Sequence, residues 1–280
     1  DNIYIRQEAE TILSKAVNVD NLLEERKISE QRWERQAVLG ATLDDLDLVE
    51  VKKTLEAFIK YATDATIIDY ESFLISRGLI VNGNITNACM VLFGKNPPRF
   101  IPQSRIKLVV HPGSKSGDTF IENMVFENNV FHNIETIRTY FDSIIGKEIK
   151  IEGAFRTEKK RYPEIAIREG LLNAIVHRDY SNLKGFLIIS IYSDRLVISN
   201  YGGLPNELTI KDLKTEHNSI LRNPDIAQMC FYRGYIEMLG TGTLRMIRAC
   251  KSEGFKTPVW KNKNNILELT FSGVSHQYEG

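Results

Sequence analysis

The sequence has few cysteines and no long apolar run, and each absence excludes a class of protein. Its three cysteines, Cys89, Cys230 and Cys250, are odd in number and far apart, without the paired spacing typical of zinc sites. This pattern indicates free thiols in a reducing, cytoplasmic setting. No stretch reaches the roughly 18 apolar residues that a membrane helix needs, so the sequence predicts no membrane partner.

An excess of charge of one sign is also missing. The 280 residues carry 36 Lys and Arg against 36 Asp and Glu, which leaves a formal net charge of +0. A neutral chain has no bulk electrostatic attraction to DNA or to a membrane surface, although a local basic patch is compatible with neutrality. Because 42% of the residues are hydrophobic, disorder is excluded, and the length suggests about two domains.

Hydrophobic spacing and turn residues predict a mixture of helices and strands, and therefore an α/β (α+β) fold class. Strand patterns cover residues 3–6, 106–110, 149–155, 187–192, 196–199 and 266–271, the last paired with residues near 259–260. Helical patterns cover residues 8–38, 44–61, 71–77, 128–145, 164–177 and pieces of 222–250. Because strand residues follow Asp1 directly, we expect the chain to begin inside a longer protein.

The most informative feature is an ordered set of polar residues and glycines in the second half of the chain. Glu169 and Asn173 are four residues apart on one predicted helix, so they share a face. A carboxylate in such a pair can take a proton from an attacking water, and a carboxamide oxygen can ligate Mg²⁺. From spacing alone, the same two residues could equally cap the helix or face solvent.

Two glycine-rich turns follow this helix. Gly202 and Gly203 permit close approach to a flat base or a ribose. Gly240, Thr241 and Gly242 allow the backbone to approach a phosphate just before a helix N-terminus, which favours an anion. Either turn alone is a weak signal, since such glycines commonly begin or end helices.

The order of these features resembles the ATP-binding fold shared by DNA gyrase, the ninety-kilodalton heat-shock protein, histidine kinases and MutL. The segment from Tyr162 to Phe271 is more closely similar to the RecG-like C-terminal branch found in bacterial predicted transcriptional regulators. The matching stretches are Arg168-Glu169, Asn173-Ala174, His177-Arg178-Asp179-Tyr180, Asp194-Arg195-Leu196, Asn200 to Pro205, Arg222-Asn223-Pro224 and Gly240-Thr241-Gly242. The resemblance implies a gyrase/histidine-kinase-like sandwich of helices on a mixed sheet.

The resemblance also implies a role for individual residues. Glu169 matches the water-activating base of the gyrase branch, and Asn173 matches the asparagine that binds Mg²⁺. Gly202 matches the first glycine of the adenine-contacting box. Gly240 and Gly242 match the second glycine box.

Three further positions qualify this assignment. Asn200 stands where the family has the aspartate that accepts from the adenine amino group, and Leu204 replaces the second glycine of that box. Asparagine can still accept through its side-chain oxygen, but it loses the charge-assisted bond, which is roughly twice as strong. His177 lies one turn after Asn173 and could face the same pocket, although a structural hydrogen-bonding role is the favoured reading of a lone histidine.

The first half of the chain resembles the parts that precede this domain in the same family. Ile3 to Arg6 is similar to the closing strand of an AlbA/Schlafen-like domain, a type implicated in nucleic-acid binding, and the stretches around Gly78, Thr86 and Leu92 are similar to the connecting region. We therefore expect three parts: residues 1–40 as the end of the AlbA/Schlafen-like domain, 41–125 as a small α/β connector, and 126–280 as the divergent ATPase-like domain.

These observations predict an ATP-binding regulatory module of a DNA-binding transcriptional regulator, with slow Mg-dependent hydrolysis. Nucleotide would change a lid near residues 206–240, the upstream domain would contact DNA, and a homodimer is a further expectation. The rival interpretation is a degenerate, non-enzymatic scaffold for dimerisation or DNA-complex assembly. A third is a nuclease or other activity upstream, regulated by this chain.

Two remaining features have simpler readings. The basic run Lys159-Lys160-Arg161 could contact nucleic acid, but three adjacent charges are more typical of a solvated loop. The two tryptophans, Trp33 and Trp260, are predicted to be packing residues.

Overall fold

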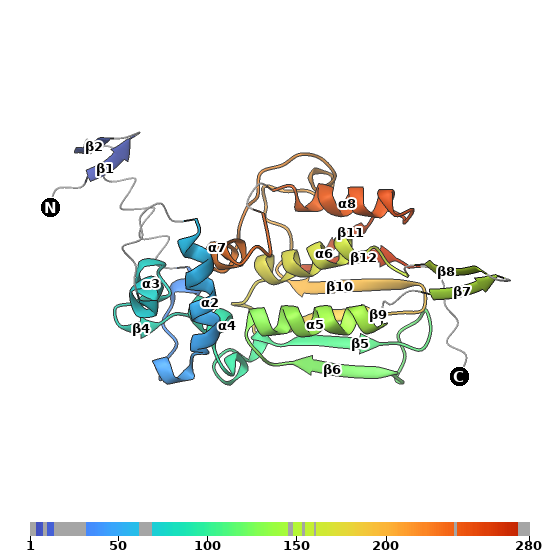
Figure 1. Ribbon diagram of the computed structural model, residues 1–280, viewed down its shortest axis with the longest axis horizontal. Coiled ribbons are helices and arrows are strands. Elements are labelled where there is room, and N and C mark those ends of the chain that lie inside the picture. The colour runs from blue at the N-terminus through green and yellow to red at the C-terminus, as the bar shows by residue number, and fades with distance from the viewer. Residues whose placement is uncertain are drawn as a thin grey trace.

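The computed structural model describes residues 4–7, 10–13, 32–61, 69–144, 148–152, 155–159, 161–237 and 240–273 (Figure 1). Its helices are α2 (Leu48–Ile59), α3 (Tyr70–Ser76), α4 (Asn87–Phe93), α5 (Val130–Ile144), α6 (Glu164–His177), α7 (Pro224–Tyr232) and α8 (Gly242–Ser252). Its strands are β1 (Tyr4–Gln7), β2 (Glu10–Leu13), β3 (Ile80–Val81), β4 (Asn84–Ile85), β5 (Ile106–Val110), β6 (Glu122–Phe126), β7 (Glu148–Glu152), β8 (Phe155–Lys159), β9 (Leu187–Ile191), β10 (Arg195–Tyr201), β11 (Val259–Lys263) and β12 (Ile266–Ser272). Short 3-10 helices are η1 (Trp33–Arg35), η2 (Leu43–Asp45), η3 (Pro97–Arg99), η4 (Pro102–Ser104) and η5 (Asp212–Lys214).

A six-stranded mixed sheet combines strands from both halves of the chain. Its strand order is β11-β12-β10-β9-β5-β6. Neighbouring strands are antiparallel except β5 and β9, which run parallel with Ile106 opposite Leu187. This arrangement of a mixed sheet with helices confirms the predicted fold class, and the predicted pairing of β12 with β11 is also confirmed.

The side-chain alternation of β9 and β10 explains which face of the sheet is covered. Leu187, Ile189 and Ile191 are buried on β9, and Leu196 and Ile198 are buried on β10, all as part of the hydrophobic core. In a strand, every second residue points to the same face. Asn200 continues the buried series of β10, so its side chain is directed toward the covered face rather than toward solvent.

Helix α6 lies between that face and the other helices. It contacts β10 on one side and α8 on another, and its buried residues surround most of its circumference. A helix that is apolar on nearly all sides is one that is enclosed by protein. Gly170 allows the close approach to the sheet, because a Cβ at this position would lie 2.8 Å from Leu269 Cδ2.

The connector packs beside the sheet through a small helical core. Helix α4 is buried along almost its whole length and forms the centre of this region. Helix α2 begins later than the predicted residue 44, because the Asp47 side chain accepts from the backbone N–H groups of Val49 and Glu50 and thereby caps the helix there. Figure 1 shows α7 between the connector helices and the sheet, although α7 follows β10 in the chain.

Two local predictions are wrong. The helix expected over residues 8–38 is replaced by strand β2 and by the short turn η1 in the parts that the structure describes, while residues 14–31 lie outside them. The basic run is not a solvated loop throughout: Arg161 is only 6% exposed and donates to the backbone carbonyls of Tyr192 and Ser193. Lys160 lies outside the described residues.

The sheet also bears on the expected division of the chain. Strands β5 and β6 come from the stretch assigned to the connector, yet both pair within the same sheet as β9 and β10. The membership of β5 and β6 in this sheet favours a start of the ATPase-like part before Ile106. The boundaries at residues 40 and 125 stay a prediction.

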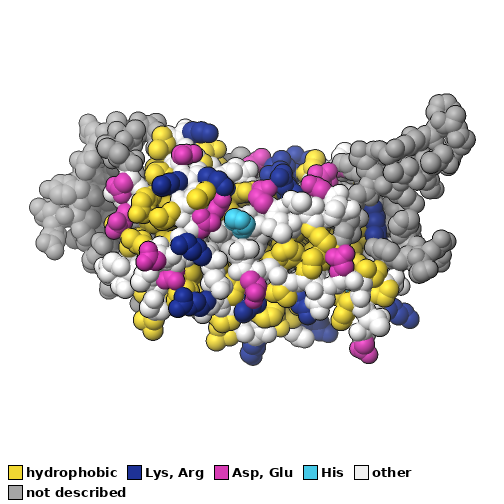
Figure 2. All heavy atoms as spheres, turned by 60° about the horizontal axis from the view of Figure 1, so that its bottom comes forward, with side chains coloured by type: hydrophobic (Ala, Val, Ile, Leu, Met, Phe, Trp, Pro, Cys, Tyr) yellow, Lys and Arg dark blue, Asp and Glu magenta, His cyan; other side chains and the backbone are white. Residues whose placement is uncertain are grey.

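The surface and the thiols agree with the composition. On the face shown in Figure 2, basic and acidic side chains are interspersed and do not gather by sign. The three cysteines are buried, and burial raises the pKa of each thiol, to about 11 for Cys250. Among the described helices, none is long and apolar enough to cross a membrane.

Candidate functional site

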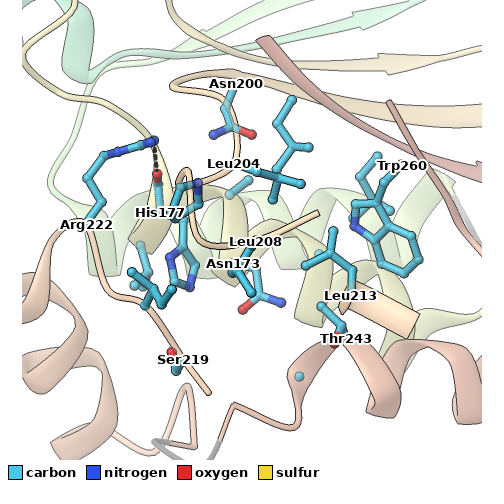
Figure 3. Close-up of a pocket in the computed structure, with 18 of the residues that line it drawn as sticks. Asn173, His177, Asn200, Leu204, Leu208, Leu213, Ser219, Arg222, Thr243 and Trp260 are labelled. Carbon is cyan, nitrogen blue, oxygen red and sulfur yellow. Dashed lines mark hydrogen bonds between the residues drawn. The ribbon is translucent and has the colours of Figure 1, made fainter. Parts of the chain in front are cut away.

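A cavity of about 1120 Å³, which includes space open to solvent, lies between α6, the sheet and the start of α8 (Figure 3). Eight of the nine residues that the sequence singled out line this cavity, and they come from three separate segments of the chain. They are Glu169, Asn173, His177, Asn200, Gly202, Gly203, Gly240 and Gly242. Thr241 is the one that does not line it.

The polar end of the cavity is formed where α8 begins against α6. A Cβ at Gly242 would lie 2.4 Å from Glu169 Oε1 and 3.1 Å from Asn173 Nδ2, so only glycine allows this approach. The first backbone N–H groups of a helix lack intrahelical partners and carry partial positive charge. The carboxylate, the carboxamide and the helix start therefore share one small region that suits an anionic group.

Glu169 has the environment of a proton acceptor. Its side chain is largely buried, and burial raises its pKa above the ordinary value. The charge of Arg245 opposes this rise and that of Glu237 adds to it. A carboxylate with a raised pKa is a stronger base, which suits general-base chemistry near neutral pH.

Asn173 offers a single oxygen ligand to a metal ion. Within the described residues no group of three His, Cys, Asp or Glu side chains is placed to hold a metal. This donor set fits Mg²⁺, which keeps several waters and is commonly bound by one or two protein oxygens together with phosphates of a substrate. It does not fit an ion such as structural zinc, which takes four protein ligands.

The opposite end of the cavity is apolar around one amide. Leu204, Leu213, Leu267 and Trp260 contribute to its lining, and Asn200 is 4% exposed among them. The Asn200 Nδ2 group lies 3.4 Å from the Tyr201 carbonyl oxygen, a long hydrogen bond. Apolar walls with one precisely placed polar side chain are typical of sites that bind a flat heterocycle.

The turn after β10 needs glycine for steric reasons. Gly202 has a φ of +91°, a region that side chains rarely adopt. A Cβ at Gly203 would lie 2.6 Å from Asn262 Oδ1. The turn is held by Asn265, whose backbone and side-chain oxygens accept from the Gly202 and Gly203 N–H groups. This turn is therefore a rigid part of the cavity wall.

His177 ends α6 at the same cavity. Burial lowers its pKa to about 4, with further lowering from the positive charge of Arg222 and from His217, while a backbone hydrogen bond with Ile220 opposes the shift. The imidazole is therefore neutral near pH 7 and is held by the segment that crosses the cavity. This geometry favours the structural reading of His177.

The segment between β10 and α7 crosses the start of α8. Gly240, just before α8, has a φ of +67° and lies close to this segment. A Cβ at Gly240 would be 2.7 Å from the His217 carbonyl oxygen. The His217 Nε2 atom is 3.1 Å from Thr243 Oγ1 on α8. Leu213 is buried at the middle of the segment. The region expected to act as a lid thus contacts the second glycine box directly.

Sequence reasoning missed four residues that the structure brings to the cavity. They are Arg222, His217, Thr243 and Trp260. Arg222 belongs to an Arg-Asn-Pro triplet that the resemblance marks without giving it a role. No signal in the sequence distinguishes Trp260 from a core residue. Its side chain is 6% exposed, and it both packs in the hydrophobic core and lines the cavity.

Comparison with known proteins supports an ATPase-like domain in this chain. Residues 186–271 match the family model described as "Putative ATP-dependent DNA helicase recG C-terminal". The match includes β9, β10, α7 and α8 but begins after α6, so the identification does not extend to Glu169 and Asn173. No curated protein matches the sequence.

One solved structure shares the fold over nearly the whole chain. It is the DIP2311 protein from Corynebacterium diphtheriae, with a TM-score of 0.70 and 19% sequence identity. The alignment covers 98% of this chain and 54% of that protein, so this chain spans about half the length of its structural relative. At this level of identity the likeness concerns the fold alone.

Proposed function

We propose that this chain is an ATP-binding regulatory module with slow, Mg-dependent hydrolysis, belonging to a DNA-binding transcriptional regulator of the cytoplasm. The observation that carries the nucleotide part is the convergence of both glycine boxes, Glu169 and Asn173 on one cavity of an ATPase-like domain. The DNA-related part is supported by the resemblance of the first half of the chain, and the contact with DNA is assigned to the region upstream.

Each residue would have a distinct task. The apolar end with Asn200 would hold the base, with the side-chain oxygen accepting from the exocyclic amine. The turn at Gly202 and Gly203 would form the wall beside it. At the other end, Asn173 would ligate Mg²⁺, and Glu169 would accept a proton from the attacking water. The ion, when bound, would supply electrostatic stabilisation of the phosphate charge.

We expect turnover to be slow because few cationic groups are free to act on a phosphate. Arg222 uses two guanidinium nitrogens on backbone carbonyls, and Arg245 pairs with Glu237 at 2.9 Å. Fast phosphoryl transfer normally needs a Lys or Arg directed at the transferred group. Among the described residues that line the cavity, no lysine is present.

The alternative function is a non-enzymatic scaffold that mediates dimerisation or DNA-complex assembly. Its specific support is Asn200, whose neutral amide replaces the carboxylate of the family's adenine box. Retention of Glu169 and Asn173 on one cavity favours the nucleotide proposal over this one.

Calorimetric titration of the chain with ATP in the presence of MgCl₂ separates the two functions. We expect one site per chain and an affinity in the micromolar to submillimolar range. Asn173→Ala is the matched variant: it should remove the part of the affinity that depends on Mg²⁺ and leave binding in EDTA unchanged. Absence of heat at millimolar ATP would rule out the nucleotide proposal.

The DNA-related part requires the full-length protein. We expect a mobility shift on duplex DNA whose affinity falls steeply between about 50 and 200 mM salt, because neutralised phosphates release counterions. A salt-independent shift, or none, would remove the electrostatic contact that the proposal assigns to the upstream region.

A further inference from the structure

Arg222 lies where the cavity wall, the end of α6 and the start of α7 meet. Its Nη1 atom donates to the carbonyl oxygen of His177 at 2.8 Å, and its Nη2 atom donates to the carbonyl oxygen of Gly203 at 2.8 Å (Figure 3). One side chain thus joins the last residue of α6 to the glycine turn. The guanidinium group suits this task because its donors have a fixed, forked geometry.

The glycine turn rests directly on this guanidinium. A Cβ at Gly202 would lie 2.0 Å from Arg222 Nη1. The turn therefore lies close to the guanidinium group as well as being hydrogen-bonded to it, so a displacement of the turn changes the contacts of Arg222. A lysine has one nitrogen on a flexible stem and cannot place two separate donor atoms at these carbonyls as the planar guanidinium does.

The next residue continues the connection into α7. Asn223 is 3% exposed, and its Nδ2 group donates to the carbonyl oxygens of Val176 at 2.7 Å and Arg178 at 2.8 Å. These carbonyls belong to the C-terminal end of α6, where the helix offers them no partner of its own. Helix α7 begins at the following residue, Pro224, so its start is clamped to the end of α6.

The first turn of α7 is held from the other side by the 3-10 helix η1. Glu34 accepts from the backbone N–H of Asp225 at 3.2 Å and of Ile226 at 2.8 Å. Arg35 donates to both carboxylate oxygens of Asp225, at 2.9 and 3.1 Å. Because Glu34 and Asp225 are both largely buried, these contacts fix the position of α7 relative to η1.

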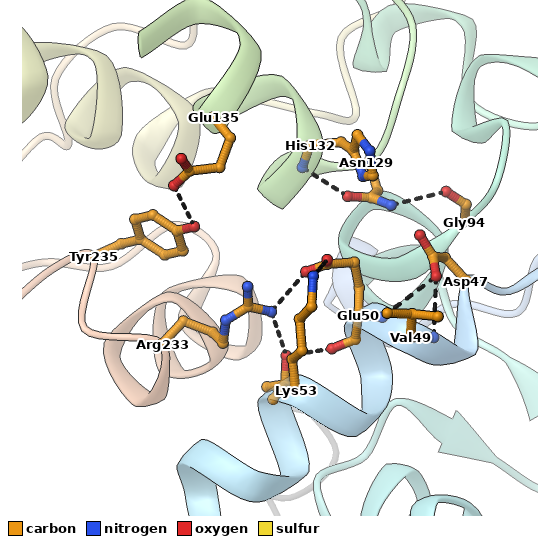
Figure 4. A network of polar contacts seen from close by, with 11 residues as sticks. Asp47, Val49, Glu50, Lys53, Gly94, Asn129, His132, Glu135, Arg233 and Tyr235 are labelled. Atoms are coloured by element: carbon orange, nitrogen blue, oxygen red, sulfur yellow. Dashed lines mark hydrogen bonds and ion pairs between the residues drawn. The ribbon is translucent and has the colours of Figure 1, made fainter. Parts of the chain in front are cut away.

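The C-terminal end of α7 is fixed to helix α2 (Figure 4). Arg233 donates to Glu50 at 2.8 Å and to Thr54 at 3.2 Å, both on α2. The chain then returns to the cavity through Tyr235, whose hydroxyl donates to Glu135 at 2.9 Å. Helix α7 is thus bound to η1 at its start and to α2 at its end, and it leads into the cavity wall at both ends.

We propose that Arg222 is a positioning residue that holds the glycine turn for its ligand and, through Asn223 and α7, links occupancy of the cavity to the cluster that Glu34 and Arg35 of η1 form with Asp225 of α7. This inference rests on the proposed nucleotide function. A ligand shifts a conformational equilibrium only through different contacts in the two states. The glycine turn that would contact the base is hydrogen-bonded to Arg222. This arginine therefore transmits the difference in contacts between the empty and the occupied cavity.

The two tryptophans allow a direct test, because they lie at the two ends of this connection. Trp260 lines the cavity, whereas Trp33 is adjacent to Glu34, does not line the cavity and stacks on Tyr180 with 5.4 Å between ring centroids. Trp260→Phe leaves Trp33 as the single tryptophan, whose emission can be excited selectively over that of the tyrosines. We expect ATP with Mg²⁺ to change the Trp33 emission with a midpoint equal to the dissociation constant measured by calorimetry on the same variant.

Two variants then separate positioning from coupling. Arg222→Lys should weaken ATP binding roughly tenfold, as expected for the loss of one charge-assisted hydrogen bond, without a matching fall in melting temperature. Asp225→Asn in the Trp260→Phe background should abolish the Trp33 response while the calorimetric affinity changes by less than roughly threefold. The matched control is Asp194→Asn, which removes a carboxylate paired with Arg195 away from α7 and should preserve the response.

The outcomes distinguish the two proposals. ATP binding with a silent Trp33, or a Trp33 response that survives in Asp225→Asn, overturns the coupling and leaves the nucleotide function standing. An Arg222→Lys protein that binds ATP as the parent does overturns the positioning role. Absence of heat in the parent chain overturns both. If Trp260→Phe itself abolishes binding, the difference between the parent and Trp33→Phe spectra reports the Trp33 response instead.

Discussion

Asn200 is a residue at which the chemistry of this cavity differs from the pattern of the ATP-binding fold that the sequence resembles. The alternation of β10 directs it toward the covered face, and it is nearly fully buried among apolar side chains. A buried amide without a strong internal partner is costly, so its oxygen and nitrogen are available to a ligand. Its neutral charge lowers the strength of that contact and does not remove it.

Restoring the carboxylate should therefore tighten ATP binding. We expect Asn200→Asp to lower the dissociation constant roughly tenfold, because a charged acceptor forms a stronger hydrogen bond with the exocyclic amine. Asn200→Ala should weaken binding by a similar factor. Calorimetry on both variants provides the measurement, and an affinity equal to that of the parent in both would show that this side chain does not contact the base.

The proposed role of Glu169 likewise depends on a single side chain, its carboxylate. We expect Glu169→Gln to reduce ATP turnover at least about 100-fold, because the amide cannot accept the proton of the attacking water. The dissociation constant should stay within roughly threefold of the parent, since the side chain keeps its size. Phosphate release and calorimetry test the two parts. Unchanged turnover would remove the base assignment.

At the scale of elements, the position of α6 on the sheet decides whether the cavity exists. The helix carries Glu169 and Asn173, and the absence of a side chain at Gly170 lets it lie against Leu269 and Phe271 of β12. A methyl group there would have to displace two buried side chains. The face of α6 that carries Glu169 and Asn173 is thus placed by the packing of the adjoining Gly170 against β12.

Gly170→Ala should destabilise the protein, although alanine is the better helix former. We expect the free energy of unfolding to fall by about 1–3 kcal/mol, as is typical of overpacking in a core. Gly113→Ala is the control, because a Cβ at Gly113 meets no atom within 4 Å and should cost little. Chemical denaturation measures both, and equal losses would contradict close packing of α6 on β12.

At the scale of the whole molecule, η1 and α2 from the first half of the chain are joined to α7 by buried ionisable side chains. Burial and the neighbouring Asp225 raise the pKa of Glu34 to about 7, against the effect of backbone hydrogen bonds and of Arg32. The ordinary value is 4.5. The folded protein therefore binds this proton more tightly than the unfolded chain does.

This difference predicts a dependence of stability on pH. The contribution of protonated Glu34 is present below about pH 4.5 and is lost as the pH rises through about 7, because the folded state must then bury a carboxylate. Relative to Glu34→Gln, the parent should lose on the order of 1–3 kcal/mol between pH 5 and pH 8. Parallel melting curves of both proteins test this, and a constant difference would contradict the raised pKa.

Local sequence signals were sufficient for part of the fold and for part of the site. The periodicity of residues 164–177 predicts α6, and the spacing of Glu169 and Asn173 places them on one face, because both depend only on helix geometry. The alternation in β9 and β10 likewise predicts their hairpin. The order of the glycine turns indicates a nucleotide site before any contact is known.

The tertiary structure alone decided what depends on contacts between distant segments. It recruits β5 and β6 to the sheet, buries Arg161 against carbonyls 31 and 32 residues away, and brings Arg222 between α6 and the glycine turn. A single sequence records which residues can form a helix or a strand, because those preferences are local. It does not record which side chains the packed chain brings together, because that depends on the burial of the whole core.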